Sequence, residues 1–147
     1  MVQDIETIMV VDDDRKLLDA IQRLLRNESL RSMTFTSPVK ALSQVNRINP
    51  AIVLSDQYMH KMFGTVFIEQ VKEKKPDSIG IIMTGHTDID PVIASIIQGD
   101  VFTFIKKPWS SHKFKSLIRD TLNHYNRLSK KINHLLPGEY GNEYKKK

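Results

Sequence analysis

Short runs of apolar residues recur along the chain at fairly even intervals and predict the strands of a β-sheet. Four runs contain almost no polar residue, which is typical of strands that are buried on both faces. These runs are Ile8 to Val11, Ala51 to Leu54, Ile79 to Met83 and Val101 to Ile105. A weaker run, Arg31 to Phe35, alternates through Met33 and Phe35, as an edge strand would. The sequence therefore predicts five strands.

Segments with helical spacing lie between these runs and after the last one. One helix face is predicted to collect Leu17, Leu18, Ile21, Leu24 and Leu25. Two further helix starts are marked by the pairs Ser37-Pro38 and Asp90-Pro91. In each pair a side chain that can cap a helix precedes a proline, whose missing N–H leaves no donor unsatisfied. Alternating strands and helices with short links predict a doubly wound α/β fold, with a parallel sheet covered on both faces.

The last helical pattern continues beyond the length that such a fold needs. Its apolar positions are Phe114, Leu117, Ile118, Leu122, Tyr125, Leu128, Ile132 and Leu135, and Pro137-Gly138 then ends the pattern. We therefore divide the chain into a domain over residues 5–125 and an extension over residues 126–147. The extension is either a linker or dimerisation segment, or a frayed tail.

Composition mainly excludes classes of protein. The chain is 40% hydrophobic and 27% charged, which is typical of a globular protein in water. Its apolar runs are too short to span a bilayer, and Met1 to Glu6 lacks the pattern of a secretory signal. The absence of cysteine excludes a disulfide framework. We expect a cytoplasmic protein without membrane contact.

The net charge of +5 is concentrated at the end of the chain. Residues 126–147 contain six basic and two acidic residues, a net charge of +4, so the rest of the chain carries +1. A basic end of this kind is usually solvated, and the body lacks the charge of a nucleic-acid-binding domain. Nucleic acid is therefore not expected as a partner.

Polar residues of chemical interest follow four of the predicted strands. Asp12-Asp13-Asp14 follows the first strand, Asp56 closes the third, Thr84 closes the fourth and Lys107-Pro108 follows the fifth. Functional groups of doubly wound sheets lie beyond the carboxyl ends of the strands. These four positions are therefore expected to converge.

Carboxylates that lie together repel one another unless a cation neutralises them. An all-oxygen ligand set suits Mg²⁺, or Mn²⁺, completed by phosphate oxygens. A carboxylate can also accept a phosphoryl group as a nucleophile, provided that metal, lysine and hydroxyl groups meet the charge on the phosphoryl oxygens. Asp56, Lys107 and Thr84 fit these roles.

The order and spacing of the four motifs resemble the receiver domain of two-component response regulators, over about residues 5–125. The resemblance implies a flavodoxin-like (βα)5 fold with strand order 2-1-3-4-5. It implies that Asp56 is the phosphoacceptor and that Asp12, Asp13, Asp56 and the backbone carbonyl of Tyr58 bind the metal. It also implies a cis bond before Pro108.

The same resemblance implies a switch. In the family, phosphorylation draws the hydroxyl at position 84 toward the phosphoryl group and lets the aromatic residue at position 104, here Phe104, turn inward. Thr84 and Lys107 would contact the phosphoryl oxygens. The face made by the fourth helix, fifth strand and fifth helix would then change its packing and control an output domain or partner. The implied phosphodonor is a sensor histidine kinase or a phosphotransfer protein, and a homodimer could form through this face or the last helix.

The loop after Asp56 departs from the family pattern. Members usually have Met-Pro and then Met-Asp-Gly, whereas this chain has Met59-His60 and then Met62-Phe63-Gly64. Loss of the proline predicts a looser loop and an altered lifetime of the phosphorylated state. Met59, Met62 and Phe63 are expected to pack the loop onto the sheet, although they could instead form a patch that binds a partner.

Three other functions compete with this interpretation. A haloacid-dehalogenase-like phosphatase would use Asp12 as its nucleophile, but Arg15 and the absence of a later acid pair on a strand end disfavour it. A flavin-binding protein would need hydroxyls and amides in the first loop, where this chain has three acids. A degenerate receiver would bind partners without phosphorylation, and the complete acid, Thr and Lys set argues against it. His60 and His86 are expected to be solvated, with no catalytic role.

Overall fold

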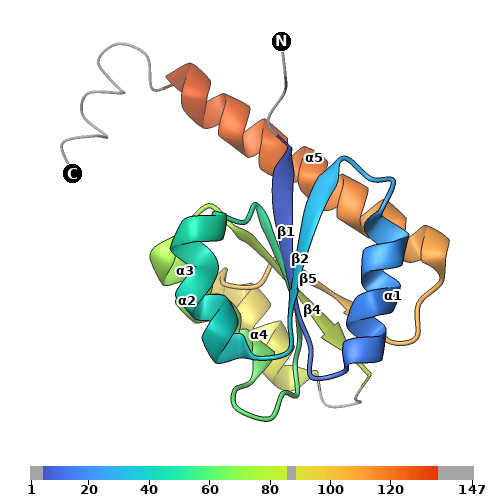
Figure 1. Ribbon diagram of the computed structural model, residues 1–147. Coiled ribbons are helices and arrows are strands. Elements are labelled where there is room, and N and C mark those ends of the chain that lie inside the picture. The colour runs from blue at the N-terminus through green and yellow to red at the C-terminus, as the bar shows by residue number, and fades with distance from the viewer. Residues whose placement is uncertain (1–4, 86–88, 136–147) are drawn as a thin grey trace.

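A computed structural model of the chain describes residues 5–85 and 89–135, with side chains up to residue 129. Its centre is a five-stranded parallel sheet with the order β2-β1-β3-β4-β5 (Figure 1). The strands are β1 (Glu6–Val11), β2 (Leu30–Phe35), β3 (Ile52–Asp56), β4 (Ile79–Thr84) and β5 (Thr103–Lys106). The predicted fold and strand order are confirmed, and the weaker strand, β2, lies at an edge.

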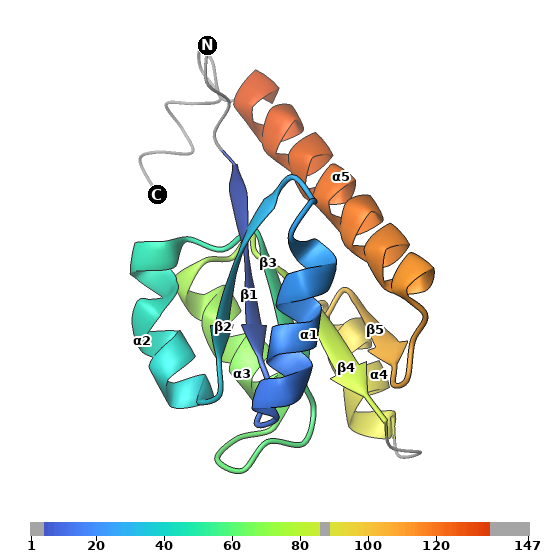
Figure 2. The same ribbon diagram turned by 45° about the vertical axis from the view of Figure 1, so that its right-hand side comes forward.

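Helices cover both faces of the sheet, as Figure 2 shows. They are α1 (Arg15–Leu25), α2 (Pro38–Ile48), α3 (Gly64–Lys74), α4 (Asp90–Gln98) and α5 (Ser111–Leu135). One apolar core joins α1 and α5 to the sheet, and a second joins α2, α3 and α4 to the opposite face. No helix within the described residues combines the length and the apolar character needed to cross a bilayer.

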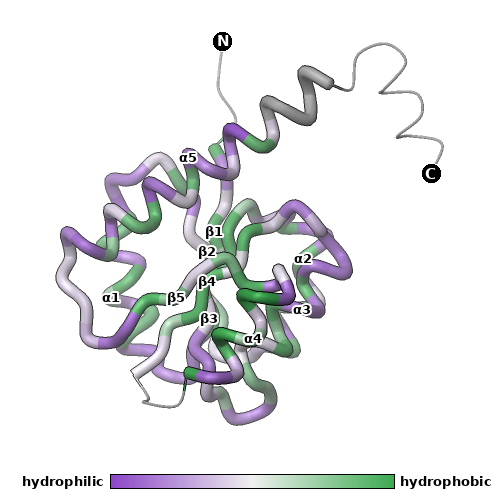
Figure 3. The backbone as a smooth tube through the Cα atoms, turned by 180° about the vertical axis from the view of Figure 1, so that it is seen from behind, coloured by the Kyte–Doolittle hydropathy of each residue, from purple (hydrophilic) through white to green (hydrophobic). Residues whose placement is uncertain are grey.

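The central strands alternate between the two cores. Ile8 and Val10 of β1 pack in the core under α1 and α5, whereas Met9 and Val11 pack in the other core. Both sets are fully buried, which explains why this strand is almost continuously apolar. Figure 3 shows this concentration of hydrophobic residues in the middle of the fold, with hydrophilic residues on the outer sides of the helices.

Two local predictions need correction. The fifth strand begins at Thr103 and not at Val101, because Val101 lies in the turn that leads from α4 to the sheet, although it is buried. Asp90 is the first residue of α4, whose N-cap is Ile89 without a capping side-chain bond. An acidic residue in the first helical turn still interacts favourably with the helix dipole. The predicted cap at Ser37 is confirmed, since its hydroxyl accepts a hydrogen bond from the Lys40 amide at 3.2 Å.

The last helix is fastened to the body at two points. The Arg119 guanidinium donates to both carboxylate oxygens of Glu28 at 2.6 and 2.8 Å. The Lys75 ammonium donates to the Tyr125 hydroxyl at 3.0 Å. Beyond Tyr125, α5 continues to Leu135, as its spacing predicts. Pro137-Gly138 lies outside the described residues.

Gly64 permits a close approach that determines how α3 meets the end of β3. A Cβ atom at this position would collide with the backbone carbonyl oxygen of Asp56 and would lie 2.9 Å from Cδ1 of Ile82. A main-chain atom in the middle of the fold cannot move aside as a flexible side chain can. The absence of a side chain at Gly64 thus fixes the distance between the helix and the strand that carries Asp56.

We expect Gly64→Ala to lower the free energy of unfolding by about 2 kcal/mol, the usual scale of overpacking in a core. Urea denaturation followed by circular dichroism measures this change. Gly85→Ala is the matched control, because its Cβ would lie 3.6 Å from the nearest Lys107 atom, an ordinary contact. Equal stability of the two variants would contradict the close-approach argument.

Candidate functional site

The predicted residues meet at the carboxyl edge of the sheet. Asp12 follows β1, Asp56 is the last residue of β3 and Lys107 follows β5. The Lys107 ammonium lies 3.0 Å from Oδ2 of Asp12 and 3.2 Å from Oδ1 of Asp56. One cation therefore bridges carboxylates that are 44 positions apart in the sequence, as the arrangement of strands requires.

This charged group is largely withdrawn from water. The side chains of Asp12, Asp56 and Lys107 are 3%, 14% and 27% exposed. Asp12 also accepts a hydrogen bond from the Asp14 amide at 2.8 Å, which fixes the orientation of its carboxylate. Two carboxylates share one ammonium, so the three groups leave an excess of negative charge.

Burial raises the pKa of the Asp56 carboxyl above its ordinary value, and the negative charge of Asp12 adds to this effect. The ammonium of Lys107 acts in the opposite direction but does not cancel the two. Burial disfavours the charged form of Lys107 itself, yet its hydrogen bonds and charge interactions with Asp12 and Asp56 give it a raised pKa. The site therefore keeps its lysine charged and makes the charge on Asp56 costly.

The three consecutive acids have three different partners. Asp12 contacts Lys107 and belongs, with Asp56, to the charged centre of the site. Oδ1 of Asp14 caps α1 by accepting from the amides of Lys16 and Leu17 at 3.0 and 3.3 Å. Asp13 is exposed, and its Oδ2 accepts a hydrogen bond from the His60 amide at 2.9 Å. This last bond joins the loop after β1 to the loop after β3. Sequence reasoning did not find it.

The loop between Asp56 and Gly64 packs in part as predicted. Met59 is 8% exposed and Met62 is packed against the core under α3, so these two residues hold the loop to the body. The prediction was wrong for Phe63, whose side chain is 54% exposed. It instead meets the Tyr58 ring edge-on, with 5.8 Å between the ring centroids, and the two residues form an isolated β-bridge.

The two predicted switch residues lie on neighbouring strands. Thr84 ends β4, is fully buried and accepts a hydrogen bond from the Lys107 amide through its carbonyl at 2.8 Å. Phe104 of β5 pairs with Ile82 of β4 and is partly buried against the core under α4. The backbone thus connects Thr84 directly to the lysine that contacts Asp56.

The donor chemistry at this edge suits a hard divalent cation, because every candidate ligand is an oxygen atom and the local charge is negative. Within the described residues, however, no three His, Cys, Asp or Glu side chains are grouped so that they could hold a metal ion. Asp13 contacts the His60 amide, whereas Asp12 and Asp56 contact the Lys107 ammonium. The oxygen donors and the excess of negative charge fit a divalent cation, and Oδ2 of Asp13 accepts the His60 amide.

An apolar pocket lies beside the lysine. Its volume is about 500 Å³, and it is lined by Asp14, Leu17, Lys107, Pro108 and Trp109. The bond between Lys107 and Pro108 is cis, as the resemblance implied. Trp109 stacks on Phe114, with 5.1 Å between the ring centroids, and so packs beside this turn.

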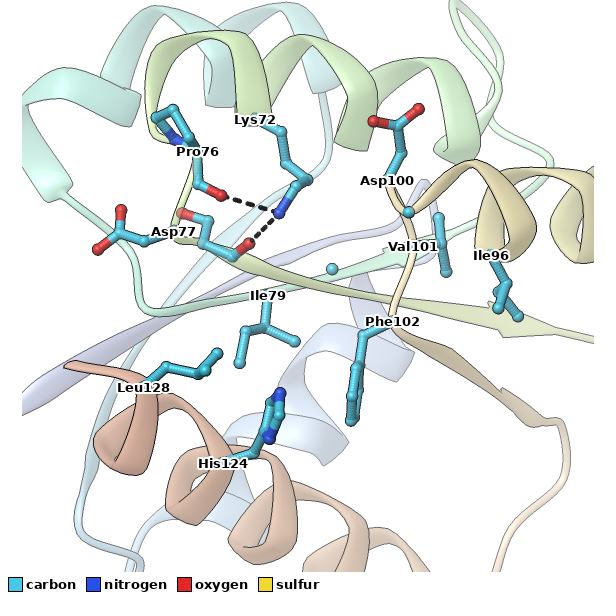
Figure 4. Close-up of a pocket in the computed structure, with 13 residues that line it drawn as sticks. Lys72, Pro76, Asp77, Ile79, Ile96, Asp100, Val101, Phe102, His124 and Leu128 are labelled. Carbon is cyan, nitrogen blue, oxygen red and sulfur yellow. Dashed lines mark hydrogen bonds between the residues drawn. The ribbon is translucent and has the colours of Figure 1, made fainter. Parts of the chain in front are cut away.

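A second pocket, of about 300 Å³, lies at the opposite edge of the sheet, where β4 begins (Figure 4). Its lysine, Lys72, donates to the carbonyls of Pro76 and Ser78 at 2.9 Å each. Phe102 stacks on His124 along one wall, with 4.8 Å between the centroids. These groups stabilise a turn and a helix contact, and none of them approaches Asp56. The exposed His60 side chain completes no catalytic set, and His86 lies outside the described residues.

Comparisons with known proteins agree with the geometry. Residues 8–119 match the response regulator receiver domain family. The hydrogenase transcriptional regulatory protein HoxA of Cupriavidus necator is 33% identical over 70% of this chain and 21% of its own length. The DNA-binding transcriptional regulator NtrC of Escherichia coli is 30% identical over 80% of this chain and 25% of its own length.

A solved structure extends the comparison. The beryllofluoride-activated NtrC4 receiver domain dimer has a TM-score of 0.75 and 27% identity, and the match covers 81% of this chain and 98% of that one. The curated relatives are much longer, since this chain spans only a fifth to a quarter of their length. The family match covers most of the chain, and the chain therefore belongs to the response regulator receiver domain family of two-component systems.

Proposed function

We propose that this domain receives a phosphoryl group on Asp56 from a histidine kinase or a phosphotransfer protein. One observation carries the proposal: the Lys107 ammonium contacts both Asp12 and Asp56 at the carboxyl edge of the sheet. A nucleophilic carboxylate and a fixed cation are thereby adjacent, which is the arrangement that phosphoryl transfer requires. The proposal includes a cytoplasmic location.

In the proposed reaction a carboxylate oxygen of Asp56 attacks phosphorus, and the bond between phosphorus and the donor nitrogen breaks with its electron pair leaving on the donor imidazole. The Lys107 ammonium lies close enough to meet the growing charge on the phosphoryl oxygens. Thr84 is the hydroxyl at the end of the neighbouring strand. A divalent cation held by Asp12, Asp13, Asp56 and the Tyr58 carbonyl would neutralise the crowded carboxylates and the incoming phosphoryl oxygens.

The output of the proposed receiver would pass through the face made by α4, β5 and α5. We propose that Thr84 and Phe104 form the switch, since they lie on adjacent strands and one of them bonds to the backbone of Lys107. The target would be an output domain or a separate protein, and a homodimer could form through this face or through the extension of α5. The NtrC4 receiver is a dimer in its activated form, which supports the last suggestion.

The position of Asp14 counts against the phosphatase alternative, in which Asp12 would be the nucleophile. Oδ1 of Asp14 accepts from the amides of Lys16 and Leu17 and so caps α1. A degenerate receiver would lack part of the charged centre, which is complete in this chain.

Incubation with acetyl phosphate and Mg²⁺ should add one phosphoryl group to the wild-type protein, detectable as an increase in intact mass. Asp56→Asn should show no increase, because an amide cannot form the acyl phosphate. Omission of Mg²⁺ should suppress the reaction in the wild type. No increase in any sample would indicate a degenerate receiver. Phosphate release that survives Asp56→Asn but disappears in Asp12→Asn would favour the phosphatase.

Adjacent lysines allow a matched test of the charged centre. Lys107→Ala should slow phosphorylation of Asp56 by roughly a hundredfold, the usual cost of removing one donor from developing charge. Lys106→Ala should react at the wild-type rate, because Lys106 is exposed and its side chain has no bond in the described structure. The rate of mass increase under acetyl phosphate measures both. Similar rates for the two variants would remove Lys107 from the mechanism.

The electrostatics of the site also predict a stability effect. A carboxyl whose pKa is raised by folding stabilises the protein only in acid, and this contribution disappears as the pH rises through the folded pKa. Asp56→Asn should therefore raise Tm at pH 7 by roughly 2–4 °C, the effect of about 1 kcal/mol in a domain of this size. The difference should shrink at a pH below the ordinary Asp range. Scanning calorimetry at both pH values tests this, and a lower Tm for Asp56→Asn at pH 7 would contradict it.

A further inference from the structure

The hydrogen bond between His60 and Asp13 connects the loop after β1 to the loop after β3. It joins a backbone N–H to a carboxylate oxygen at 2.9 Å, across 47 positions of the sequence. A proline at position 60, which the family pattern usually has, would carry no N–H and could not form it. The missing proline is expected to loosen this loop, but the hydrogen bond from His60 to Asp13 restrains it.

The base of the loop after Asp56 is closed by bonds of its own. The Gly64 amide donates to the Gln57 carbonyl at 2.8 Å, and the Thr65 amide donates to the Gln57 side chain at 2.9 Å. The bridge between Tyr58 and Phe63 lies inside this closure. The bond from His60 is a polar contact that joins the tip of this loop to the loop after β1.

The Asp13 carboxylate has two possible partners, the His60 amide and a divalent cation. An exposed N–H that loses its acceptor can bond to water instead, so the tie from His60 is replaceable at modest cost. A divalent cation attracts a carboxylate more strongly than a neutral amide does. The same cation would draw in the Tyr58 carbonyl, two residues before His60.

We propose that the His60 amide competes with the divalent cation for Asp13, so that metal binding detaches the tip of the Asp56–Gly64 loop from the acidic loop. His60 is then a positioning residue, which acts through Asp13 and lowers the affinity for the metal. This inference rests on the proposed function, because it takes Asp13 to be a metal ligand. Metal occupancy and the conformation of the loop next to Asp56 become linked.

The direct test follows the His60 amide in ¹⁵N-labelled wild-type protein as MgCl₂ is added. Exchange of this amide with water should accelerate roughly three- to tenfold at saturation, the effect of losing one hydrogen bond of ordinary strength. The Gly64 amide is the internal control, since its bond to the Gln57 carbonyl does not involve Asp13. Unchanged exchange at His60, while Asp12 and Asp56 respond to Mg²⁺, would overturn the inference.

A pair of variants separates the amide from the imidazole. His60→Pro removes the N–H and should tighten Mg²⁺ binding by roughly three- to tenfold. His60→Ala keeps the N–H and should bind as the wild type does. The fluorescence of Trp109, the single tryptophan of the chain, which lines a pocket with Lys107, reports the titration. Thermal unfolding followed by circular dichroism confirms that both variants are folded.

The outcomes distinguish this inference from the function on which it rests. Equal or weaker binding by a folded His60→Pro would show that the bond orients Asp13 and does not compete for it. If His60→Pro fails to fold, the amide-exchange measurement on the wild type still decides. A wild-type protein in which no resonance near Asp12 or Asp56 responds to Mg²⁺ would overturn the metal site itself, and the inference with it.

Discussion

Two carboxylates that share one ammonium at a nearly dry edge of the sheet are the constraint around which this domain is built. Asp12 and Asp56 would repel each other strongly if Lys107 did not lie 3.0 and 3.2 Å from them. Burial makes the negative charge on Asp56 costly, as its raised pKa records. A fold that maximised stability would avoid this arrangement. The same excess of negative charge would attract a divalent cation, which the proposed phosphoryl transfer needs.

The rest of the structure holds these charges in place. The ends of β1, β3 and β5 bring together residues that the sequence separates widely, and the apolar cores on both faces keep the strands in register. Gly64 allows α3 to begin against the carbonyl of Asp56, so the strand end cannot drift. The Lys107 amide bonds to the Thr84 carbonyl, which fixes the start of the lysine side chain. Local rigidity is what allows a strained charge distribution to persist.

Sequence patterns predicted the sheet and its charged edge because both follow from rules that involve many residues at once. Continuous apolar runs identify buried parallel strands, and strand ends in such a sheet converge whatever the loops do. The errors arose where single contacts decide. Phe63 is exposed and packs against the Tyr58 ring, and Asp90 is no cap because α4 begins at that residue. The bond between His60 and Asp13 could not be predicted, since a backbone donor finds its acceptor through loop geometry that no residue type encodes.

The site and the end of α5 lie at opposite edges of the sheet, which limits how one can affect the other. In Figures 1 and 2, α5 starts near the carboxyl edge, where β5 ends, and runs past the opposite edge, where β1 begins. Along this path Trp109 stacks on Phe114 next to Lys107, and Phe102 stacks on His124 one strand length away. Tyr125 then bonds to Lys75 where the helix leaves the body. A displacement at Lys107 would reach the extension through contacts of this kind, because they join α5 to the rest of the domain. The two aromatic stacks therefore join α5 to both ends of β5, in addition to the polar contacts that Arg119 and Tyr125 make with the body.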